Sequence, residues 1–191
     1  PSAAVRASYD LSDRPFFLYP ANTYPHKNHA VLVEAMAQLV DHHPEALLVL
    51  TGGTASAEPA LEAEVFRRNL TAHVRRPGRV PEADLEGLFA EATALVFPSR
   101  YEGFGAPIVE AMQRRCPVIG ADTTAVPEVA GGAALLVDPD DPEGWAAAMA
   151  TVLEDPGRRA LLAEAGTARA HAFAPDRAAA ALEAAYGRVL R

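Results

Sequence analysis

The sequence predicts an α/β domain built on a doubly wound parallel sheet, for three reasons. Short apolar runs alternate along the chain with longer segments of helical periodicity. The apolar runs lack polar alternation, which indicates strands that are covered on both faces. The repeated strand–helix order implies parallel pairing through right-handed crossovers. We therefore expect one Rossmann-like domain, because 191 residues fill a single well-packed domain but would make two small ones.

Three strand–helix units open the predicted sheet. The runs "PFFLYPA" and "ALLVLTGG" are apolar and of strand length, and a helical pattern follows each of them. A third segment, "HVRRPGRV", precedes the helix "PEADLEGLFAEA", where Pro81 suits a first turn. The predicted strands are 15–21, 46–53 and 73–80, and the helices after them are 27–43, 58–70 and 81–92.

The second half of the chain continues the alternation and then becomes helical. The run "TALVFPS" predicts a strand, and "PVIG" and "AALLVD" predict two more. The apolar faces of the last two helices are expected to pack mostly on this domain, with part of the face of the final helix left exposed as the alternative. In order, we predict strand 93–99, helix 106–115, strand 117–120, a short helical turn at "VPEVA", strand 133–138, and helices 142–154, 156–171 and 175–190.

Composition excludes several classes of protein. The net charge of −8 has the wrong sign for a protein that holds nucleic acid through a broad basic face. No apolar run approaches the roughly 18 residues of a membrane span, and the first twenty residues lack a signal-peptide core, so we expect a soluble, cytoplasmic protein. The single cysteine, Cys116, stands beside a predicted strand and is expected to be a buried structural thiol.

Two glycines flank Phe104 directly before the helix predicted to begin at Ala106. In parallel sheets, ligands bind beyond the carboxyl ends of the strands, and this turn lies there. Since Pro107 suits a first helical turn, Gly103 and Gly105 would leave free backbone N–H groups at the positive end of the helix dipole. A phosphate or a sugar hydroxyl fits such a turn. The alternative is that the glycines only permit a tight connection.

Glutamates stand on both sides of this turn, with seven residues between them. Glu110 is expected in the first helical turn, where the dipole alone stabilises a carboxylate by up to about 1 kcal/mol. Because a carboxylate repels phosphate, its expected role beside a bound nucleotide is to accept hydrogen bonds from the ribose diol. Glu102 would lie nearer the reacting sugar, where it could bond hydroxyls or offset developing positive charge.

Lys27 stands at the predicted start of a helix, where a cation is disfavoured by roughly 0.3 to 1 kcal/mol. A diphosphate held between Lys27 and the glycine turn would offset this cost, and a solvated surface lysine is the alternative. Gly52 and Gly53 fit either close approach of a ligand to the backbone or a turn with positive φ. We expect no metal site. The histidines at 26 and 29 bracket the start of a predicted helix, and those at 42 and 43 end it more than two turns away, too far for one four-ligand site.

The segment "PSRYEGFGAPIVEAM", followed by "PVIGADTTAVPEVAGGAALLVDPDDPEGWAAAM", resembles the donor-binding half of the retaining group 1 (family 4) glycosyltransferases. These enzymes have the two-domain GT-B architecture. The likeness covers residues 15–190, and its specificity comes from the combination of "FPS", the two glutamates around G-F-G, and the later P-E-V element. The absence of a G-x-G-x-x-G fingerprint after the first strand also speaks against a dehydrogenase.

The resemblance implies a role for each matching residue. It places Glu110 at the ribose hydroxyls, Glu102 at the donor sugar and Lys27 at the diphosphate. Many members carry an arginine about six residues before the lysine, but Ala21 stands here, so either Asn22 and its neighbours take its place, or phosphate binding is weaker or uses another cation. The remaining positions implied in donor binding are Gly103, Phe104, Gly105 and Ala106 for the sugar and diphosphate, and Arg79, Val80, Pro81 and Leu85 for the base.

The expected function is that of one half of a hexosyltransferase. The parent enzyme would transfer a sugar from a nucleotide diphosphate sugar to an acceptor hydroxyl in polysaccharide or glycoconjugate biosynthesis, with no cofactor and with possible peripheral membrane association. Residues 1–191 would form the donor domain alone, without the N-terminal acceptor domain, and would be inactive in transfer; the missing initiator methionine favours this interpretation. A stand-alone nucleotide-sugar binding module and a nucleotide-sugar epimerase are the alternatives.

Overall fold

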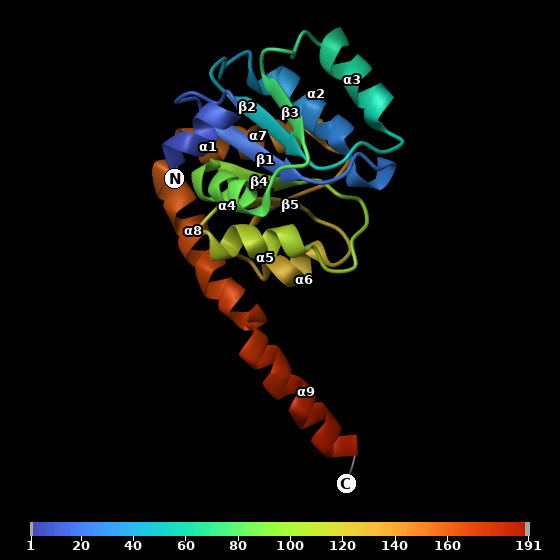
Figure 1. Ribbon diagram of the computed structural model, residues 1–191, viewed down its shortest axis with the longest axis vertical. Coiled ribbons are helices and arrows are strands. Elements are labelled where there is room, and N and C mark those ends of the chain that lie inside the picture. Colours follow the sequence, from blue (N-terminus) through green and yellow to red (C-terminus); the bar gives the residue numbers. More distant parts are fainter. Residues whose placement is uncertain (1, 190–191) are drawn as a thin grey trace.

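Six parallel strands form the sheet in the part of the chain that the computed structural model describes, residues 2–189. The strand order is β3-β2-β1-β4-β5-β6, and every strand pair is parallel. The predicted doubly wound sheet is therefore confirmed, with each strand inside or close to its predicted range (Figure 1). The strands are β1 (Phe16–Pro20), β2 (Leu47–Thr51), β3 (Val74–Gly78), β4 (Ala94–Phe97), β5 (Val118–Ala121) and β6 (Leu135–Val137).

The helices pack in two groups on opposite faces of the sheet (Figure 1). On one face α2 packs against α3 and α7, and on the other α5 packs against α4, α6 and α8. From β1 the sheet is extended toward one edge by β2 and β3 and toward the other edge by β4, β5 and β6. Because the crossovers are right-handed in both directions, their helices cover opposite faces of the sheet. The helices are α1 (Ser2–Ser8), α2 (His29–Leu39), α3 (Glu58–Arg67), α4 (Glu82–Glu91), α5 (Ala106–Gln113), α6 (Val126–Ala130), α7 (Pro142–Glu154), α8 (Pro156–Ala170) and α9 (Pro175–Val189), with 3-10 turns η1 (Pro25–Lys27) and η2 (His171–Phe173).

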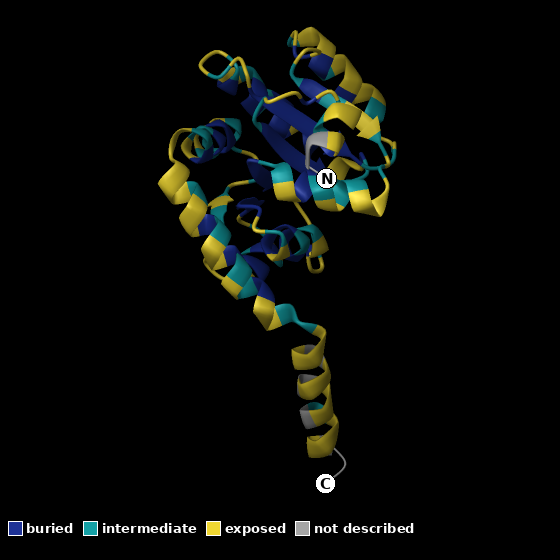
Figure 2. Ribbon diagram, turned by 60° about the vertical axis from the view of Figure 1, so that its left-hand side comes forward, coloured by how far each residue is buried: buried dark blue, intermediate teal, exposed yellow. Residues whose placement is uncertain are grey.

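The hydrophobic core lies along the central strands. Every residue of β2, β4 and β5 is buried, as expected for strands covered on both faces (Figure 2). Trp145 and Tyr19 are the largest fully buried side chains among the described residues. The Cys116 thiol is buried as predicted, and burial raises its pKa to about 12, so it packs as a structural side chain.

The structure adds one helix that the sequence did not predict. No helix was predicted before the first strand, but α1 forms there and packs on α4. Val5 is buried, and the Arg6 Nε donates a hydrogen bond to Glu91 Oε2 at 2.8 Å. A helix of seven residues is too short to display a repeating apolar pattern, so its position depends on these tertiary contacts.

The last helix corrects a second expectation. Whereas α8 packs on α5 and α7 as predicted, α9 extends away from the domain and, among the described residues, makes its closest contacts with η2 (Figures 1 and 2). Ala174 has extended backbone before Pro175 and redirects the chain. The side chains of Leu182 and Tyr186 are 57% and 60% exposed. The predicted helix end at Leu190 lies outside the described residues.

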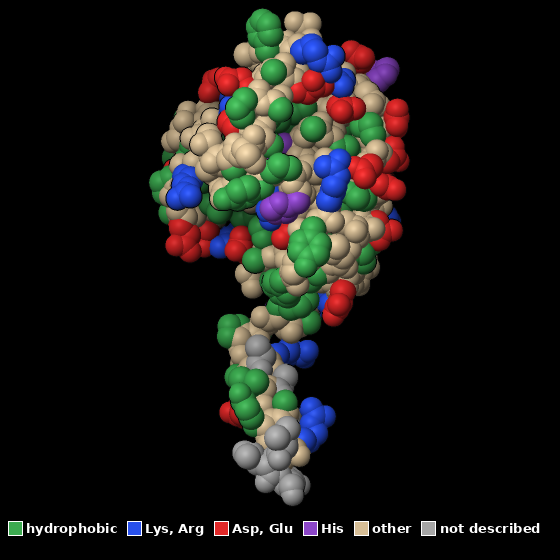
Figure 3. Space-filling model, turned by 90° about the vertical axis from the view of Figure 1, so that its right-hand side faces the viewer, with side chains coloured by type: hydrophobic (Ala, Val, Ile, Leu, Met, Phe, Trp, Pro, Cys, Tyr) green, Lys and Arg blue, Asp and Glu red, His purple; other side chains and the backbone are tan. Residues whose placement is uncertain are grey.

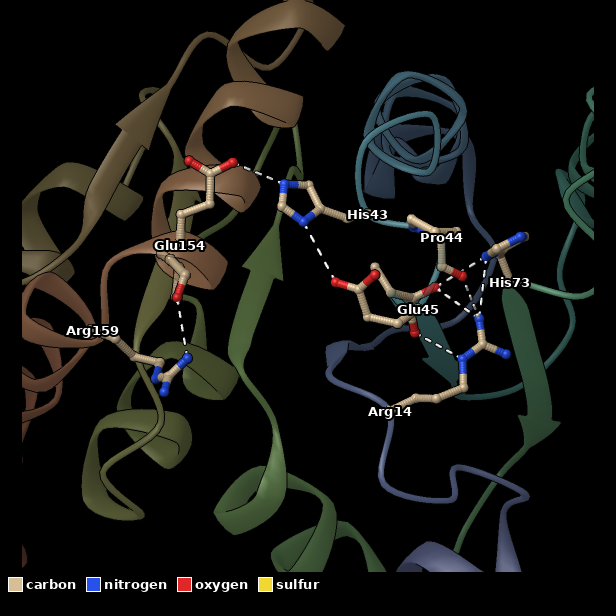
Figure 4. Close-up of polar contacts among 9 residues, drawn as sticks. Arg14, His43, Pro44, Glu45, His73, Glu154 and Arg159 are labelled. Atoms are coloured by element: carbon tan, nitrogen blue, oxygen red, sulfur yellow. Dashed lines mark hydrogen bonds and ion pairs between the residues drawn. The ribbon is translucent and has the colours of Figure 1, made fainter.

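The amino edge of the sheet is held by hydrogen bonds between the segments that precede the strands (Figure 4). Arg14, just before β1, donates to the carbonyl oxygen of Glu45 at 2.8 Å and to that of Pro44 at 3.3 Å. His43, after α2, lies 2.9 Å from the Glu154 carboxylate of α7. These contacts fix the edge opposite the carboxyl ends of the strands.

Within the described part of the chain, no helix has the length and apolarity needed to cross a membrane.

Candidate functional site

A cavity of about 440 Å³ opens beyond the carboxyl ends of the central strands. β1 and β4 are neighbours there, and their following helices leave toward opposite faces, which creates the crevice where open α/β sheets bind ligands. The cavity is bounded by the loops after β1, β2 and β3 and by the start of α5. Its lining residues are Pro20, Ala21, Asn22, Tyr24, Lys27, Thr51, Gly52, Arg79, Val80, Leu85, Phe97 and Pro107.

Lys27 enters this cavity from a 3-10 turn, not from the start of an α-helix as predicted. It ends η1, and Asn28 in left-handed conformation, with φ of 56°, separates that turn from α2. Two hydrogen bonds hold this segment. The buried Tyr19 hydroxyl donates to the Lys27 carbonyl oxygen at 2.8 Å, and Asn28 Nδ2 donates to the Pro139 carbonyl oxygen at 2.6 Å. These bonds hold the backbone from which the Lys27 side chain extends.

The Lys27 ammonium forms an ion pair with Glu102. Its Nζ lies 2.5 Å from Glu102 Oε1, and the two side chains are only 21% and 13% exposed. The interpretation of Lys27 as a solvated surface lysine is thus wrong, and a carboxylate of the chain itself supplies the offsetting charge. The Glu102 backbone N–H also donates to Thr124 Oγ1 at 3.2 Å. Thr124 has a φ of 50°, which is rare for a β-branched residue.

The two glycines of the turn differ in what they permit. Gly105 has a φ of 92° and precedes the first residue of α5, Ala106, so it is needed for the abrupt start of the helix. Gly103 has no such φ, and a Cβ there would meet no described atom within 4 Å. The fold therefore requires glycine at 105, whereas glycine at 103 leaves an open approach to the backbone. Phe104, between them, packs edge-to-face on Phe173 with ring centroids 5.5 Å apart.

Glu110 lies just beyond the first turn of α5, in which it was expected. The helix begins at Ala106, so Glu110 is its fifth residue, outside the first turn in which the dipole acts most strongly. The side chain is half-buried and is not among the residues that line the cavity. Pro107, one turn earlier on the same helix, does line it. Glu110 thus stands on the helix that borders the cavity, next to the lining residues.

The loops after β1 and β2 are joined through Asn22 and the predicted glycine pair. Asn22 Oδ1 accepts a hydrogen bond from the Gly53 N–H at 2.6 Å. Gly52 has a φ of 124°, and a Cβ there would lie 2.5 Å from the carbonyl oxygen of Ala21. The alternative of a turn with positive φ is therefore confirmed for Gly52, and the backbone that approaches it closely is the chain's own.

The loop after β3 and the first turn of α4 bring three of the four residues implied in base binding to the cavity. Arg79, Val80 and Leu85 line it, and Pro81 is the N-cap of α4 instead of a first-turn residue. Among the lining residues, two are basic and none is acidic. This local charge contrasts with the net charge of −8 for the chain.

Aromatic residues around the cavity were not predicted. Tyr24 and Phe97 line it, and Tyr101 lies exposed on the next loop. The Tyr24 ring stacks on His26 with centroids 5.9 Å apart. On the face that carries η1, hydrophobic side chains gather around a histidine (Figure 3). No sequence motif marks these aromatic residues.

The described residues contain no cluster of three or more His, Cys, Asp or Glu placed to hold a metal ion.

Comparison with known families decides the classification. The family model "Glycosyl transferases group 1" matches residues 3–169, which is most of the chain. The chain belongs to this family. The prediction made from the segment around Gly103 to Gly105 is thereby confirmed.

Relatives of this group 1 glycosyltransferase chain include enzymes and solved structures. It is 35% identical over 170 residues to O-antigen chain mannosyltransferase B of Escherichia coli, covering 88% of this chain and 45% of that protein. Sucrose-phosphate synthase from Thermosynechococcus elongatus superposes with a TM-score of 0.86 and 30% identity, covering 100% and 49% of the two chains. Anabaena HepE, solved in complex with UDP and glucose, has a TM-score of 0.80 and 25% identity, covering 87% and 46%. The chain thus spans about half the length of these proteins.

Proposed function

We propose that this chain is the nucleotide-sugar donor-binding domain of a retaining GT-B glycosyltransferase. The complete enzyme would transfer a sugar from a nucleotide diphosphate sugar to an acceptor hydroxyl. The observation that carries this proposal is the cavity at the carboxyl edge, which joins Lys27, Arg79 and Pro107 in the first turn of α5 without any acidic lining residue among those described. The match to a group 1 family model and the UDP and glucose bound by HepE support it.

In this proposal the diphosphate lies between Lys27 and the Gly103–Gly105 turn. The ammonium and the free N–H groups before α5 would stabilise the leaving group, because both favour negative charge. Protein cations would thus carry the role that a metal has in other sites. Val80, Pro81 and Leu85 would contact the base, while Glu110 would accept hydrogen bonds from the ribose diol.

Glu102 is assigned to the reacting sugar. Its carboxylate would bond sugar hydroxyls or offset the positive charge that develops at the anomeric carbon. The retaining outcome would follow from attack by the acceptor on the same face that the diphosphate leaves. The acceptor site would belong to an N-terminal domain outside residues 1–191, so this chain alone would bind donor without transferring sugar.

The proposed process is cytoplasmic polysaccharide or glycoconjugate synthesis, with the complete enzyme acting peripherally at a membrane. The similarity to O-antigen chain mannosyltransferase B of Escherichia coli supports a substrate of this kind. A nucleotide sugar is the only small molecule that the proposal requires.

Calorimetric titration of the chain with UDP, GDP, ADP and dTDP tests the proposal. We expect one nucleotide to bind selectively, and Lys27→Ala and Glu110→Ala to weaken its binding. Glu154→Ala, at the opposite edge of the sheet, is the control that should leave the affinity unchanged. If no nucleotide binds at millimolar concentration, or if the two site variants bind as tightly as the control, the proposed donor site is wrong.

A further inference from the structure

The two basic residues of the cavity differ in how far their charge is already neutralised. The Lys27 ammonium contacts the Glu102 carboxylate at 2.5 Å. Arg79 forms no ion pair and no side-chain hydrogen bond with any residue in the described range 2–189. Since no described acidic residue lines the cavity, Arg79 is the side chain that gives its wall a net positive charge.

The guanidinium of Arg79 lies over the loop that follows β2. A Cβ added to Gly53 would lie 3.0 Å from Arg79 Nε and 3.4 Å from its Nη2. The same Cβ would lie 3.1 Å from Asn22 Oδ1. The absence of a side chain at Gly53 therefore gives the guanidinium room beside Asn22, at the junction of the loops after β1 and β2.

This placement suits an anion better than a neutral base. The net charge of −8 repels a diphosphate at long range, so the attraction has to come from charges at the cavity itself. A guanidinium presents several N–H donors in one plane and binds two phosphate oxygens at once. Lys27 is a single point charge for which a diphosphate has to compete with the carboxylate of Glu102.

We infer that Arg79 binds the diphosphate of the donor and is the first cation that the diphosphate meets, in place of the contact with the base that the sequence predicted. This inference rests on the proposed function, because it assigns a residue within the same donor site. Ala21, where a cation was expected from the resemblance, contributes only a short apolar side chain to the wall.

The test compares a nucleoside diphosphate with its own nucleoside. After titration of the unmodified chain identifies which of UDP, GDP, ADP and dTDP binds, both ligands are titrated by NMR into Arg79→Ala, Arg79→Lys and Arg158→Ala. Arg158, an exposed residue of α8 outside the cavity, controls for the loss of one positive charge. We expect Arg79→Ala to weaken the diphosphate about tenfold or more and the nucleoside less than about twofold, since a hydrogen bond to a charged group is lost only for the former.

The matched variants sharpen this expectation. Arg79→Lys should retain part of the diphosphate affinity, because it keeps the charge but loses the planar set of donors. Arg158→Ala should leave both affinities unchanged. Gly53→Ala should weaken the diphosphate through displacement of the guanidinium, and much less so when Arg79 is already alanine. Such a non-additive pair would show that Gly53 acts through Arg79.

The outcomes separate this inference from the function on which it rests. Equal losses for the diphosphate and the nucleoside would assign Arg79 to the base and overturn the inference while leaving the donor site intact. An unchanged diphosphate affinity in Arg79→Ala would overturn it equally. If the unmodified chain binds none of the four diphosphates, the proposed function fails, and the inference fails with it.

Discussion

Replacing Glu102 by glutamine should make the chain bind a nucleoside diphosphate more tightly, although Glu102 itself belongs to the proposed site. In the structure this carboxylate forms an ion pair with the Lys27 ammonium at 2.5 Å. An incoming diphosphate has to displace it or bind beside it, and either event costs free energy. The amide of Glu102→Gln keeps the size of the side chain and removes the competing charge.

The size of the effect follows from the environment of the pair. Two unit charges about 4 Å apart interact by about 4 kcal/mol at an effective dielectric constant of 20. Most of this is offset by desolvation and by solvent contact, since the side chains are 21% and 13% exposed. Net values for pairs of this kind are about 0.5 to 1.5 kcal/mol, so the affinity should rise about two- to tenfold.

The assay is calorimetric titration with the nucleoside diphosphate that the unmodified chain selects, at low and at high salt. A diphosphate without its sugar is the right probe, because it cannot lose any contact between Glu102 and the sugar. Glu91→Gln is the matched control: Glu91 also forms a half-exposed ion pair, with Arg6 at 2.8 Å, and its loss changes the net charge equally. Weaker binding by Glu102→Gln, or the same gain in Glu91→Gln, would refute the competition for Lys27.

Three further predictions concern the support of the site. Gly52→Ala should lower the free energy of unfolding by about 2 to 4 kcal/mol, because its φ is 124° and the new Cβ would lie 2.5 Å from the Ala21 carbonyl oxygen. Urea titration measures this loss. It should be smaller for the control Gly78→Ala, whose φ is 76° but whose surroundings are open. Burial lowers the pKa of His29 from 6.5 to about 4, so the unfolded state binds the extra proton between these pH values. The free energy of unfolding should therefore fall by about 3 kcal/mol as the pH drops through this window. Urea titrations at pH 7 and pH 4.5 measure it, and the difference in free energy of unfolding between the two pH values should be smaller for His29→Asn than for the unmodified chain. Tyr19→Phe removes the hydroxyl that holds the Lys27 carbonyl oxygen and should cost about 1 kcal/mol of stability, measured by thermal melting, and weaken diphosphate binding severalfold.

The sheet was predictable because its strands are buried on both faces. Continuous apolar runs such as that ending in Phe97 have few alternatives once helical patterns stand between them. Elements whose position depends on distant contacts were not predictable. The short helix α1 is held by Val5 and Arg6 against α4, and α9 departs from the domain after Ala174. Neither feature leaves a periodic signal in the local sequence.

The candidate site was predictable in its parts and less so in its arrangement. Their places before predicted helices identified Lys27 and Gly105, the family resemblance implied Arg79, and the sheet order brings their loops to one edge. The first residue of α5, Ala106, was predicted correctly, but the expected place of Glu110 in the first turn was wrong, because the fifth residue of a helix with 3.6 residues per turn lies just beyond that turn. Thr124 was missed entirely, since its importance lies in an unusual φ and in one hydrogen bond to the Glu102 backbone.

The electrostatic state of the site depends on which loops meet. From the sequence, Glu102 and Glu110 are two similar acids on either side of a glycine turn. In the structure only Glu102 meets Lys27, because β1 and β4 are adjacent and their loops face each other across the crevice. That contact neutralises the cation the motif points to and leaves Arg79 as the unpaired charge of the cavity. Strand order therefore determines which of the predicted residues is free to bind an anion.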